Sequence, residues 1–272
     1  MVLFEINFFS NTLGINTKLN VLLPQKGSKE IDSNDIDSND IVNKNRIPVL
    51  YLLHGMGNDE SVWLRRTSIE RYASQYGFAV VIPTTYLGGY NDTAYGVRYW
   101  TYISKEVPQF CKEYFNNFSD KKEDTFVAGV SLGGHGAFKL ALRNPDKFMA
   151  AASLSGPLNI ASKAKIQDLK RKNKIFWEGV FGPLDNMENS NNDLVYLLES
   201  FIKAGRKKDI PKLYAWCGTE DFLYDNNLEM EEKMKELDIN IEFAYSEGTH
   251  NWTAWDREIQ NVLKWFDKIR NK

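Results

Sequence analysis

Residues 125–137 read Thr-Phe-Val-Ala-Gly-Val-Ser-Leu-Gly-Gly-His-Gly-Ala and hold the most informative pattern in the chain. The run starts as an apolar, strand-like segment, passes through Gly129-Val130-Ser131-Leu132-Gly133, and continues into helix-like residues 138–142. A strand, a sharp turn and a helix around a serine are the context of a nucleophile elbow. A strained turn leaves no room for a Cβ two residues before or after the serine, which explains the glycines. This context favours a reactive Ser131 over a glycine-rich turn with an incidental serine.

The composition is that of a folded domain without a strong charge bias. The chain has 272 residues, of which 43% are hydrophobic and 13% aromatic, and its formal net charge is −2. This length fits one α/β domain, and the apolar content is enough for a sizeable core. The charge gives no indication of binding to nucleic acid or to an anionic membrane surface.

The cysteines and the N-terminus bear on the cellular compartment. The two cysteines, Cys111 and Cys217, lie in a helix-like and an apolar segment, so we expect buried free thiols in a reducing compartment rather than a disulfide. Residues 1–10 lack the basic start of a signal peptide, and no apolar run approaches the length of a membrane span. We therefore expect a cytoplasmic protein.

Strand-like and helix-like segments alternate along most of the chain. The pattern predicts helices at 61–76, 104–118, 138–142, 229–237 and 252–269, and strands at 2–8, 17–24, 47–53, 78–82, 125–130, 149–154, 212–217 and 239–245. The first two strands are expected to pair antiparallel. The alternation predicts a single α/β domain, 1–272, with a mostly parallel sheet covered by helices on both faces. Ligand chemistry is then expected at the carboxyl ends of the strands.

Two segments interrupt the alternation. Residues 25–46 form a low-complexity segment that contains Ile-Asp-Ser-Asn-Asp twice, at 31–35 and 36–40. The repeat lacks the glycine and the closing glutamate of an EF-hand loop, so a solvated surface loop is favoured over a calcium site. Residues 156–210 are polar and lysine-rich, and we expect a cap-like excursion there. No metal ion or cofactor is expected.

A serine hydroxyl needs a base to become nucleophilic, and the chain has three histidines. His135 lies just beyond the elbow, where the helix is expected to turn it away from Ser131. His54 is expected to brace its own loop. His250 lies between the last strand and the last helix, from where it can reach Ser131. The alternative for His250 is a loop histidine that binds backbone groups.

The base in turn needs a carboxylate that fixes its tautomer. If the order along the chain is serine, acid, histidine, the acid follows a strand between the other two. Asp221 has this position, after the strand at 212–217. Glu220 and Asp225 are weaker candidates, and each of the three could instead be a carboxylate near a helix N-terminus. Asp256 follows the histidine and is disfavoured.

A tetrahedral intermediate needs two backbone N–H donors for its oxyanion. One is expected from Leu132, directly after the serine. The other is expected from Met56, in the His-Gly-Met-Gly segment 54–57 that follows the strand at 47–53. An aromatic loop, residues 86–100, and the cap-like segment, residues 156–210, are expected to close the pocket. Its candidate wall residues are Trp63, Tyr86 and Trp100.

With these segments in order, the chain resembles the tributyrin esterase branch of the esterase D-like α/β-hydrolases. The resemblance spans nearly the whole chain and rests on the motifs at 52–57, 63–67, 92–96, 128–134, 218–223 and 248–252. It implies the α/β-hydrolase fold and a serine carboxylesterase that hydrolyses short acyl esters through an acyl-enzyme. It also implies that Ser131, Asp221 and His250 form the triad.

Several alternatives stay open at this point. Feruloyl and acetyl-xylan esterases and S-formylglutathione hydrolases carry similar motifs. Residues 133–137 resemble the elbow of the formylglutathione enzymes, but segment 54–57 lacks the cysteine that they usually place nearby. A peptidase and a non-catalytic α/β-hydrolase that only binds a ligand are less favoured. A small-molecule ester is the expected partner, and an exposed aromatic residue such as Trp177 could serve a homo-oligomer interface.

Overall fold

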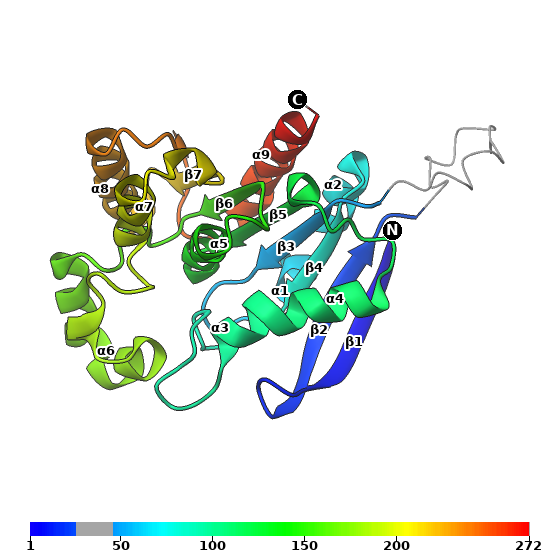
Figure 1. The fold of residues 1–272 in the computed structure, drawn as a ribbon, viewed down its shortest axis with the longest axis horizontal. Helices are drawn as coiled ribbons and strands as arrows, with labels where there is room; N and C mark the ends of the chain where they lie inside the picture. Colours follow the sequence, from blue (N-terminus) through cyan, green and yellow to red (C-terminus); the bar gives the residue numbers. More distant parts are fainter. Residues whose placement is uncertain (26–45, 272) are drawn as a thin grey trace.

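The computed structural model describes residues 1–25 and 46–271 and has one eight-stranded sheet at its centre (Figure 1). The strand order is β1-β2-β4-β3-β5-β6-β7-β8. β1 and β2 pair antiparallel, as expected, and β2 is antiparallel to β4, whereas the strands from β4 to β8 in this order all pair in parallel. The strands are β1 (Val2–Ser10), β2 (Ile15–Leu23), β3 (Val49–Leu53), β4 (Ala79–Pro83), β5 (Thr125–Val130), β6 (Ala150–Leu154), β7 (Lys212–Gly218) and β8 (Glu242–Ser246).

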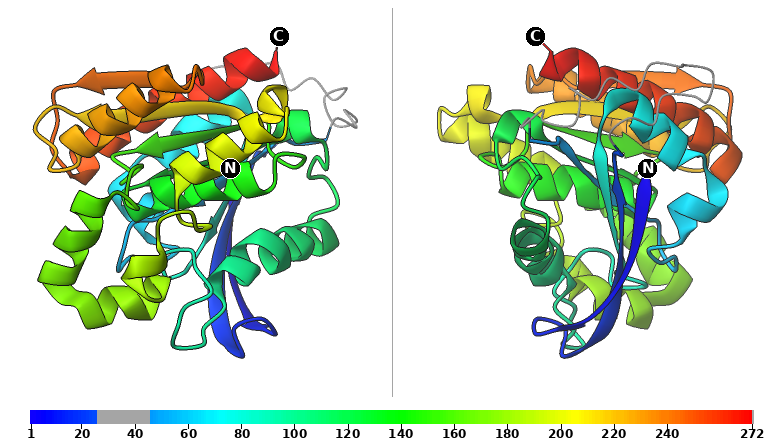
Figure 2. Two further views of the ribbon diagram at one scale, coloured as in Figure 1. Left: turned by 60° about the vertical axis from the view of Figure 1, so that its left-hand side comes forward. Right: turned by 90° about the vertical axis from the view of Figure 1, so that its right-hand side faces the viewer.

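Helices cover both faces of the sheet, which confirms the predicted α/β architecture (Figures 1 and 2). α1, α2 and α9 pack on one face, and α4, α5, α7 and α8 contribute to the core on the other. The helices are α1 (Val62–Arg66), α2 (Ile69–Tyr76), α3 (Tyr99–Thr101), α4 (Val107–Tyr114), α5 (Leu132–Arg143), α6 (Lys163–Phe181), α7 (Leu194–Lys203), α8 (Tyr224–Glu236) and α9 (Trp252–Arg270).

β3 shows why the buried strands are apolar at every position. Successive side chains of a strand point to opposite faces of the sheet. Leu50 and Leu52 accordingly join the core beneath α2 and α9, whereas Val49, Tyr51 and Leu53 join the core beneath α5. Both faces are covered, so every residue of β3 is buried.

Several predicted boundaries were wrong, and α5 starts at Leu132 rather than at 138. The helix expected at 61–76 breaks into α1 and α2, because Thr67 is extended and the Ser68 N–H donates to the Asp256 carboxylate. The helix expected at 104–118 ends at Tyr114 and is preceded by α3 and a π-helical turn. α8 starts before 229, and β8 starts only at Glu242, where its pairing with β7 begins.

The cap segment, residues 156–210, forms helices and loops, and its helix α6 lies apart from the helices that cover the sheet (Figure 2, left). α6 is kinked at Asn173, whose side-chain oxygen accepts the Phe176 N–H at 3.1 Å and so starts the second half of the helix. Leu184, Met187 and α6 residues pack together with Leu132, directly after the elbow.

Both cysteines are buried and free, as predicted. The acidic repeat at 31–40 lies outside the described residues. Across the parts of the chain that the structure describes, no helix has the length and apolarity needed to cross a membrane.

Candidate active site

The fold brings Ser131, Asp221 and His250 together at the carboxyl edge of the sheet. Ser131 follows β5, Asp221 lies after β7, and His250 lies after β8. His250 Nε2 is 2.9 Å from Ser131 Oγ, and His250 Nδ1 is 2.8 Å from Asp221 Oδ2 and 3.0 Å from Oδ1. Ser131 and His250 are 119 positions apart in the chain, and the fold joins them with Asp221 in one series of hydrogen bonds.

The turn at Ser131 has the strained geometry that its glycines predicted. Ser131 has φ 54° and ψ −128°, which a side-chain-bearing residue rarely adopts. A Cβ on Gly129 would lie 2.3 Å from the Gly133 carbonyl oxygen, and one on Gly133 would lie 2.4 Å from the His54 carbonyl oxygen. Only glycine fits at either position, because both sites face backbone atoms that cannot move aside.

The hydrogen bonds fix where the protons lie. An ionised carboxylate can only accept, so the Asp221 contact requires the proton of neutral His250 on Nδ1. Nε2 is then the acceptor for the Ser131 hydroxyl. This arrangement can remove the hydroxyl proton as the serine attacks an electrophile.

The surroundings of Asp221 keep it ionised. Its side chain has no exposed surface, and burial raises the pKa of a carboxyl group. Hydrogen bonds from His250, the Leu223 N–H and Ser155 outweigh burial and place the Asp221 pKa below its ordinary value. The carboxylate is therefore available to stabilise an imidazolium on His250.

The other carboxylate candidates have different partners. Glu220 Oε2 accepts the Gly248 N–H at 2.7 Å and so ties the two loops of the site together. Asp225 lies in the first turn of α8. Asp256 accepts from the Ser68 N–H and the Tyr72 hydroxyl on the α2 side of the sheet.

Both remaining histidines are buried and bind backbone groups. His54 Nε2 accepts the Thr85 N–H at 2.9 Å, and Nδ1 contacts the Gly55 carbonyl at 2.7 Å, so the ring braces its loop as expected. His135 Nε2 contacts the Asn192 carbonyl at 2.9 Å and is turned away from Ser131. Burial lowers the pKa of each ring to about 4, so both are neutral at physiological pH.

The two expected oxyanion donors lie on either side of the serine. Leu132 starts α5, and Met56 lies in the loop after β3. This loop is close to the nucleophile, since a Cβ on Gly55 would lie 3.3 Å from Ser131 Cβ. Within residues 1–25 and 46–271, neither the Met56 nor the Leu132 N–H donates to another protein group. Both donors therefore stay available for an oxyanion.

Two of the three predicted pocket residues were wrong. Trp63 has 0% exposure, donates to the Leu53 carbonyl and belongs to the core between the sheet and α9, so it cannot contact a substrate. Trp100 lies 4.0 Å from the Arg143 guanidinium, at the far end of α5 from Ser131. Tyr86 stays a prediction: it is 43% exposed, and its carbonyl accepts the Gly57 N–H beside the oxyanion loop.

The sequence analysis missed the apolar cluster beside Leu132. This cap cluster consists of the buried residues Leu132, Ile160, Ala161, Ile166, Leu169, Leu184 and Met187, with Met56, Trp177 and Phe181 packed against it. Its members come from the elbow, the oxyanion loop and the cap segment, so no local periodicity relates them. Phe222 was also missed, although it directly follows Asp221; its ring is 68% exposed and lies 4.5 Å from the His250 ring.

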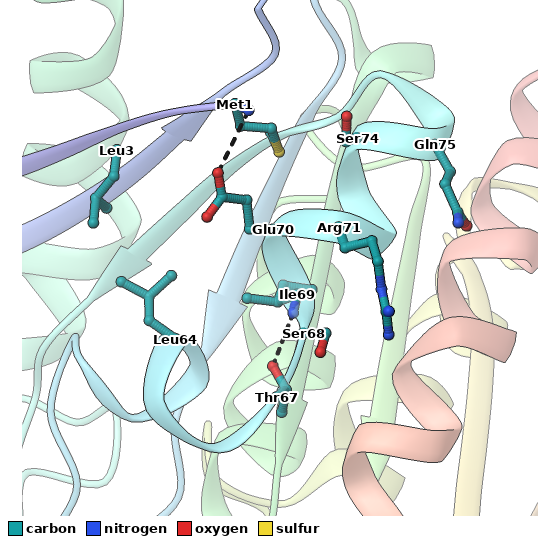
Figure 3. Close-up of a pocket in the computed structure, with 10 residues that line it drawn as sticks. All are labelled: Met1, Leu3, Leu64, Thr67, Ser68, Ile69, Glu70, Arg71, Ser74 and Gln75. Carbon is teal, nitrogen blue, oxygen red and sulfur yellow. Dashed lines mark hydrogen bonds and ion pairs between the residues drawn. The ribbon is translucent and has the colours of Figure 1, made fainter. Parts of the chain in front are cut away.

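A recess in the described part of the chain lies away from the Ser131 series. It has a volume of about 720 Å³ and is lined by Met1, Leu3 and residues of α1 and α2 (Figure 3). Met1 and Glu70 form an ion pair at 3.4 Å on its wall. No member of the Ser131 series lines it, so it is separate from the candidate active site.

Comparison with known proteins supports a hydrolytic site. The family "Esterase: Putative esterase" matches residues 10–266. A similar characterised protein is an acetyl esterase of Caldicellulosiruptor saccharolyticus, which is 29% identical over 273 residues and aligned over 99% of both chains.

Two solved structures from Staphylococcus aureus are similar along almost their entire length. One is FphF, a fluorophosphonate-binding serine hydrolase, with 32% identity, a TM-score of 0.84 and coverage of 98% of each chain. The other is the S-formylglutathione hydrolase FrmB, with 32% identity, a TM-score of 0.81 and the same coverage.

Proposed function

The chain belongs to the Esterase family and is a serine esterase with the α/β-hydrolase fold, and from this premise we propose that Ser131, His250 and Asp221 are its catalytic triad. The observation that carries the proposal is the continuous series of hydrogen bonds from Ser131 Oγ through the His250 ring to the buried Asp221 carboxylate.

The geometry supports a two-step acyl transfer. His250 Nε2 takes the hydroxyl proton as Ser131 Oγ attacks the ester carbonyl, and Asp221 stabilises the imidazolium that results. Collapse of the tetrahedral intermediate breaks the ester bond, and His250 gives its proton to the leaving alcohol. Water, activated by the same histidine, then hydrolyses the acyl-enzyme and restores Ser131.

The Met56 and Leu132 N–H groups are proposed to hold the oxyanion of each tetrahedral intermediate. Both flank Ser131 and have no other acceptor within the described part of the chain. Donors that are already aimed at the developing charge need no reorganisation during the reaction, which is why they accelerate it.

We propose short acyl esters as the substrate class. The apolar cap cluster meets the site at Leu132 and Met56, so an aliphatic acyl group can pack beside the nucleophile. The similarity to an acetyl esterase over nearly the whole chain also supports a small acyl group. Within the Esterase family, we predict that this protein belongs to the tributyrin esterase branch.

A formyl thioester is the second candidate, because the chain is 32% identical to FrmB over 98% of both chains. A panel of acetyl, butyryl, octanoyl and feruloyl esters and S-formylglutathione, compared by kcat/KM, separates the candidates. We expect the highest kcat/KM for the acetyl or butyryl ester. A higher value for the formyl thioester would replace the proposed substrate class, and one for the feruloyl ester would indicate an aromatic acyl pocket.

Fluorophosphonate labelling tests the nucleophile. We expect stoichiometric labelling of the native protein and complete loss of labelling and esterase activity in Ser131→Ala. Ser153→Ala is the control: Ser153 is buried on β6, and its hydroxyl has no partner among the described residues. Labelling that persists in a folded Ser131→Ala variant would show that another residue is the nucleophile.

A cytoplasmic location remains a proposal, supported by the two buried free thiols. A homo-oligomer likewise remains a proposal, which light scattering of the purified protein would test.

A further inference from the structure

Ser155 is the residue directly after β6, and it has an unusual backbone conformation. It is fully buried and has φ 52°, in the left-handed region that favours glycine. Its N–H donates to the Trp216 carbonyl at 2.7 Å, which fixes this conformation. Strain of this kind in a non-glycine residue points to a role for the side chain.

The hydroxyl of Ser155 links two parts of the active site. Its oxygen accepts the indole N–H of Trp255 at 3.0 Å, which leaves its own proton free to donate. The same hydroxyl contributes to the lowered pKa of the neighbouring Asp221 carboxylate.

Trp255 also contacts the base itself. The indole ring and the His250 ring pack edge to face, with centroids 4.9 Å apart and an interplanar angle of 86°. Ser155, Trp255 and His250 therefore form a series of contacts: Trp255 donates its indole N–H to Ser155 and packs its ring against the His250 imidazole.

We propose that Ser155 and Trp255 are positioning residues of the esterase site. Trp255 fixes the plane of the His250 imidazole, and Ser155 holds the indole in place by accepting its N–H. Neither residue touches the reacting atoms, so both act through His250. This inference rests on the proposed triad.

Ser155→Gly removes the hydroxyl and tolerates the positive φ, so the variant is expected to fold, with relief of backbone strain offsetting part of the cost of the unpaired Trp255 indole N–H. We expect kcat for the best ester of the panel to fall by about tenfold to a hundredfold, because the indole loses its acceptor and the His250 imidazole loses its fixed neighbour. KM is expected to stay within about twofold, since no substrate contact is removed. Ser153→Ala, two residues earlier on the same strand, is the matched control and is expected to retain the native kcat.

Trp255→Phe keeps an aromatic ring against His250 and removes only the indole N–H. We expect a smaller fall in kcat, of about threefold to tenfold. In the double variant, kcat is expected to match that of Trp255→Phe alone, because the Ser155 hydroxyl acts through the indole N–H that is already missing. Proton NMR of the His250 Nδ1–H is expected to show a shifted or faster-exchanging signal in both single variants and an unchanged signal in Ser153→Ala.

The results separate this inference from the proposed triad. If native protein is labelled at Ser131 while Ser155→Gly keeps native kcat, the positioning role is wrong and the triad stands. If Ser155→Gly and Trp255→Phe lower kcat independently and additively, Ser155 does not act through Trp255 and the proposed series of contacts is wrong. If native protein is not labelled at Ser131, the proposed function itself fails.

Discussion

At the scale of single residues, Asp221 and Glu220 show how the hydrogen-bond partner of a carboxylate decides its role. They are neighbours in the chain and carry the same functional group. The Asp221 side chain is buried and contacts His250, whereas Glu220 points the other way and accepts the Gly248 N–H. We infer that only Asp221 can fix the tautomer of the base, while Glu220 fixes the loop that carries it.

Asp221→Asn tests this assignment. The amide keeps the shape of the side chain but can present a donor to Nδ1, which favours the wrong histidine tautomer. We expect kcat to fall by about a thousandfold to ten-thousandfold with the fold intact. Glu220→Gln is the control, since it keeps an acceptor for Gly248, and it is expected to stay within about threefold of the native kcat. Similar losses in the two variants would contradict the assignment.

His54 and His135 predict how stability depends on pH. Each has a pKa near 4 in the folded protein and about 6.5 when unfolded, so the unfolded chain binds protons first as the pH falls. The two neutral rings contribute fully to the free energy of unfolding above about pH 6.5. This contribution is lost progressively toward pH 4, up to roughly 3 kcal/mol for each histidine. Urea unfolding at pH 7.5, 6.5, 5.5 and 5.0 measures this. An unfolding free energy that does not fall over this range would contradict the prediction.

At the scale of elements, the turn between β5 and α5 requires a glycine at 129, because the backbone of Gly133 lies directly against it. Gly129→Ala would place a Cβ 2.3 Å from the Gly133 carbonyl oxygen, so β5 and α5 could not both keep their positions. We expect a loss of at least about 3 kcal/mol in the free energy of unfolding, or failure to fold. Denaturant unfolding with circular dichroism measures it.

The control for this turn is Gly179→Ala in helix α6. A Cβ there would approach only Tyr95, at 3.5 Å, which is ordinary contact. Alanine has the better helix propensity, so we expect unchanged stability or a gain of up to about 1 kcal/mol. If both alanine variants had the same stability, steric exclusion at the elbow would not explain Gly129.

At the scale of the whole molecule, Lys139 connects parts that are far apart in the chain. It lies buried on α5, and its Nζ donates to the Tyr90 carbonyl at 3.1 Å and to the side-chain oxygens of Asn91 at 2.6 Å and Asn192 at 2.7 Å. These acceptors belong to the aromatic loop and the cap segment, which flank the active site. One ammonium group therefore anchors both to the helix that follows Ser131.

Lys139→Met keeps the length of the side chain and leaves the three acceptors without their donor. We expect a loss of about 2–4 kcal/mol in the free energy of unfolding and a higher KM, because the substrate-facing loops lose their anchor. Lys105→Met, at an exposed position, is the control and is expected to change stability by less than about 0.5 kcal/mol. Native stability and KM in Lys139→Met would show that the loops are held by other contacts.

The sequence alone determined the order and type of the main elements and the three members of the proposed catalytic triad. The apolar run of β3 and the glycines around Ser131 have local causes, namely burial on both faces and steric exclusion by nearby backbone. The position of Asp221 and His250 after strands placed them on one edge, because parallel strands end together. Each inference needed only short-range pattern and sheet topology.

Only the tertiary structure decided which side chains face that edge. Trp63 and Trp100 lie near promising motifs in the chain but pack into the core and against the far end of α5, respectively. The cap cluster and the Ser155–Trp255 hydrogen bond join segments separated by many residues. The burial of a side chain and its hydrogen-bond partners depend on how elements that are distant in the chain pack together. A local sequence pattern cannot predict that packing.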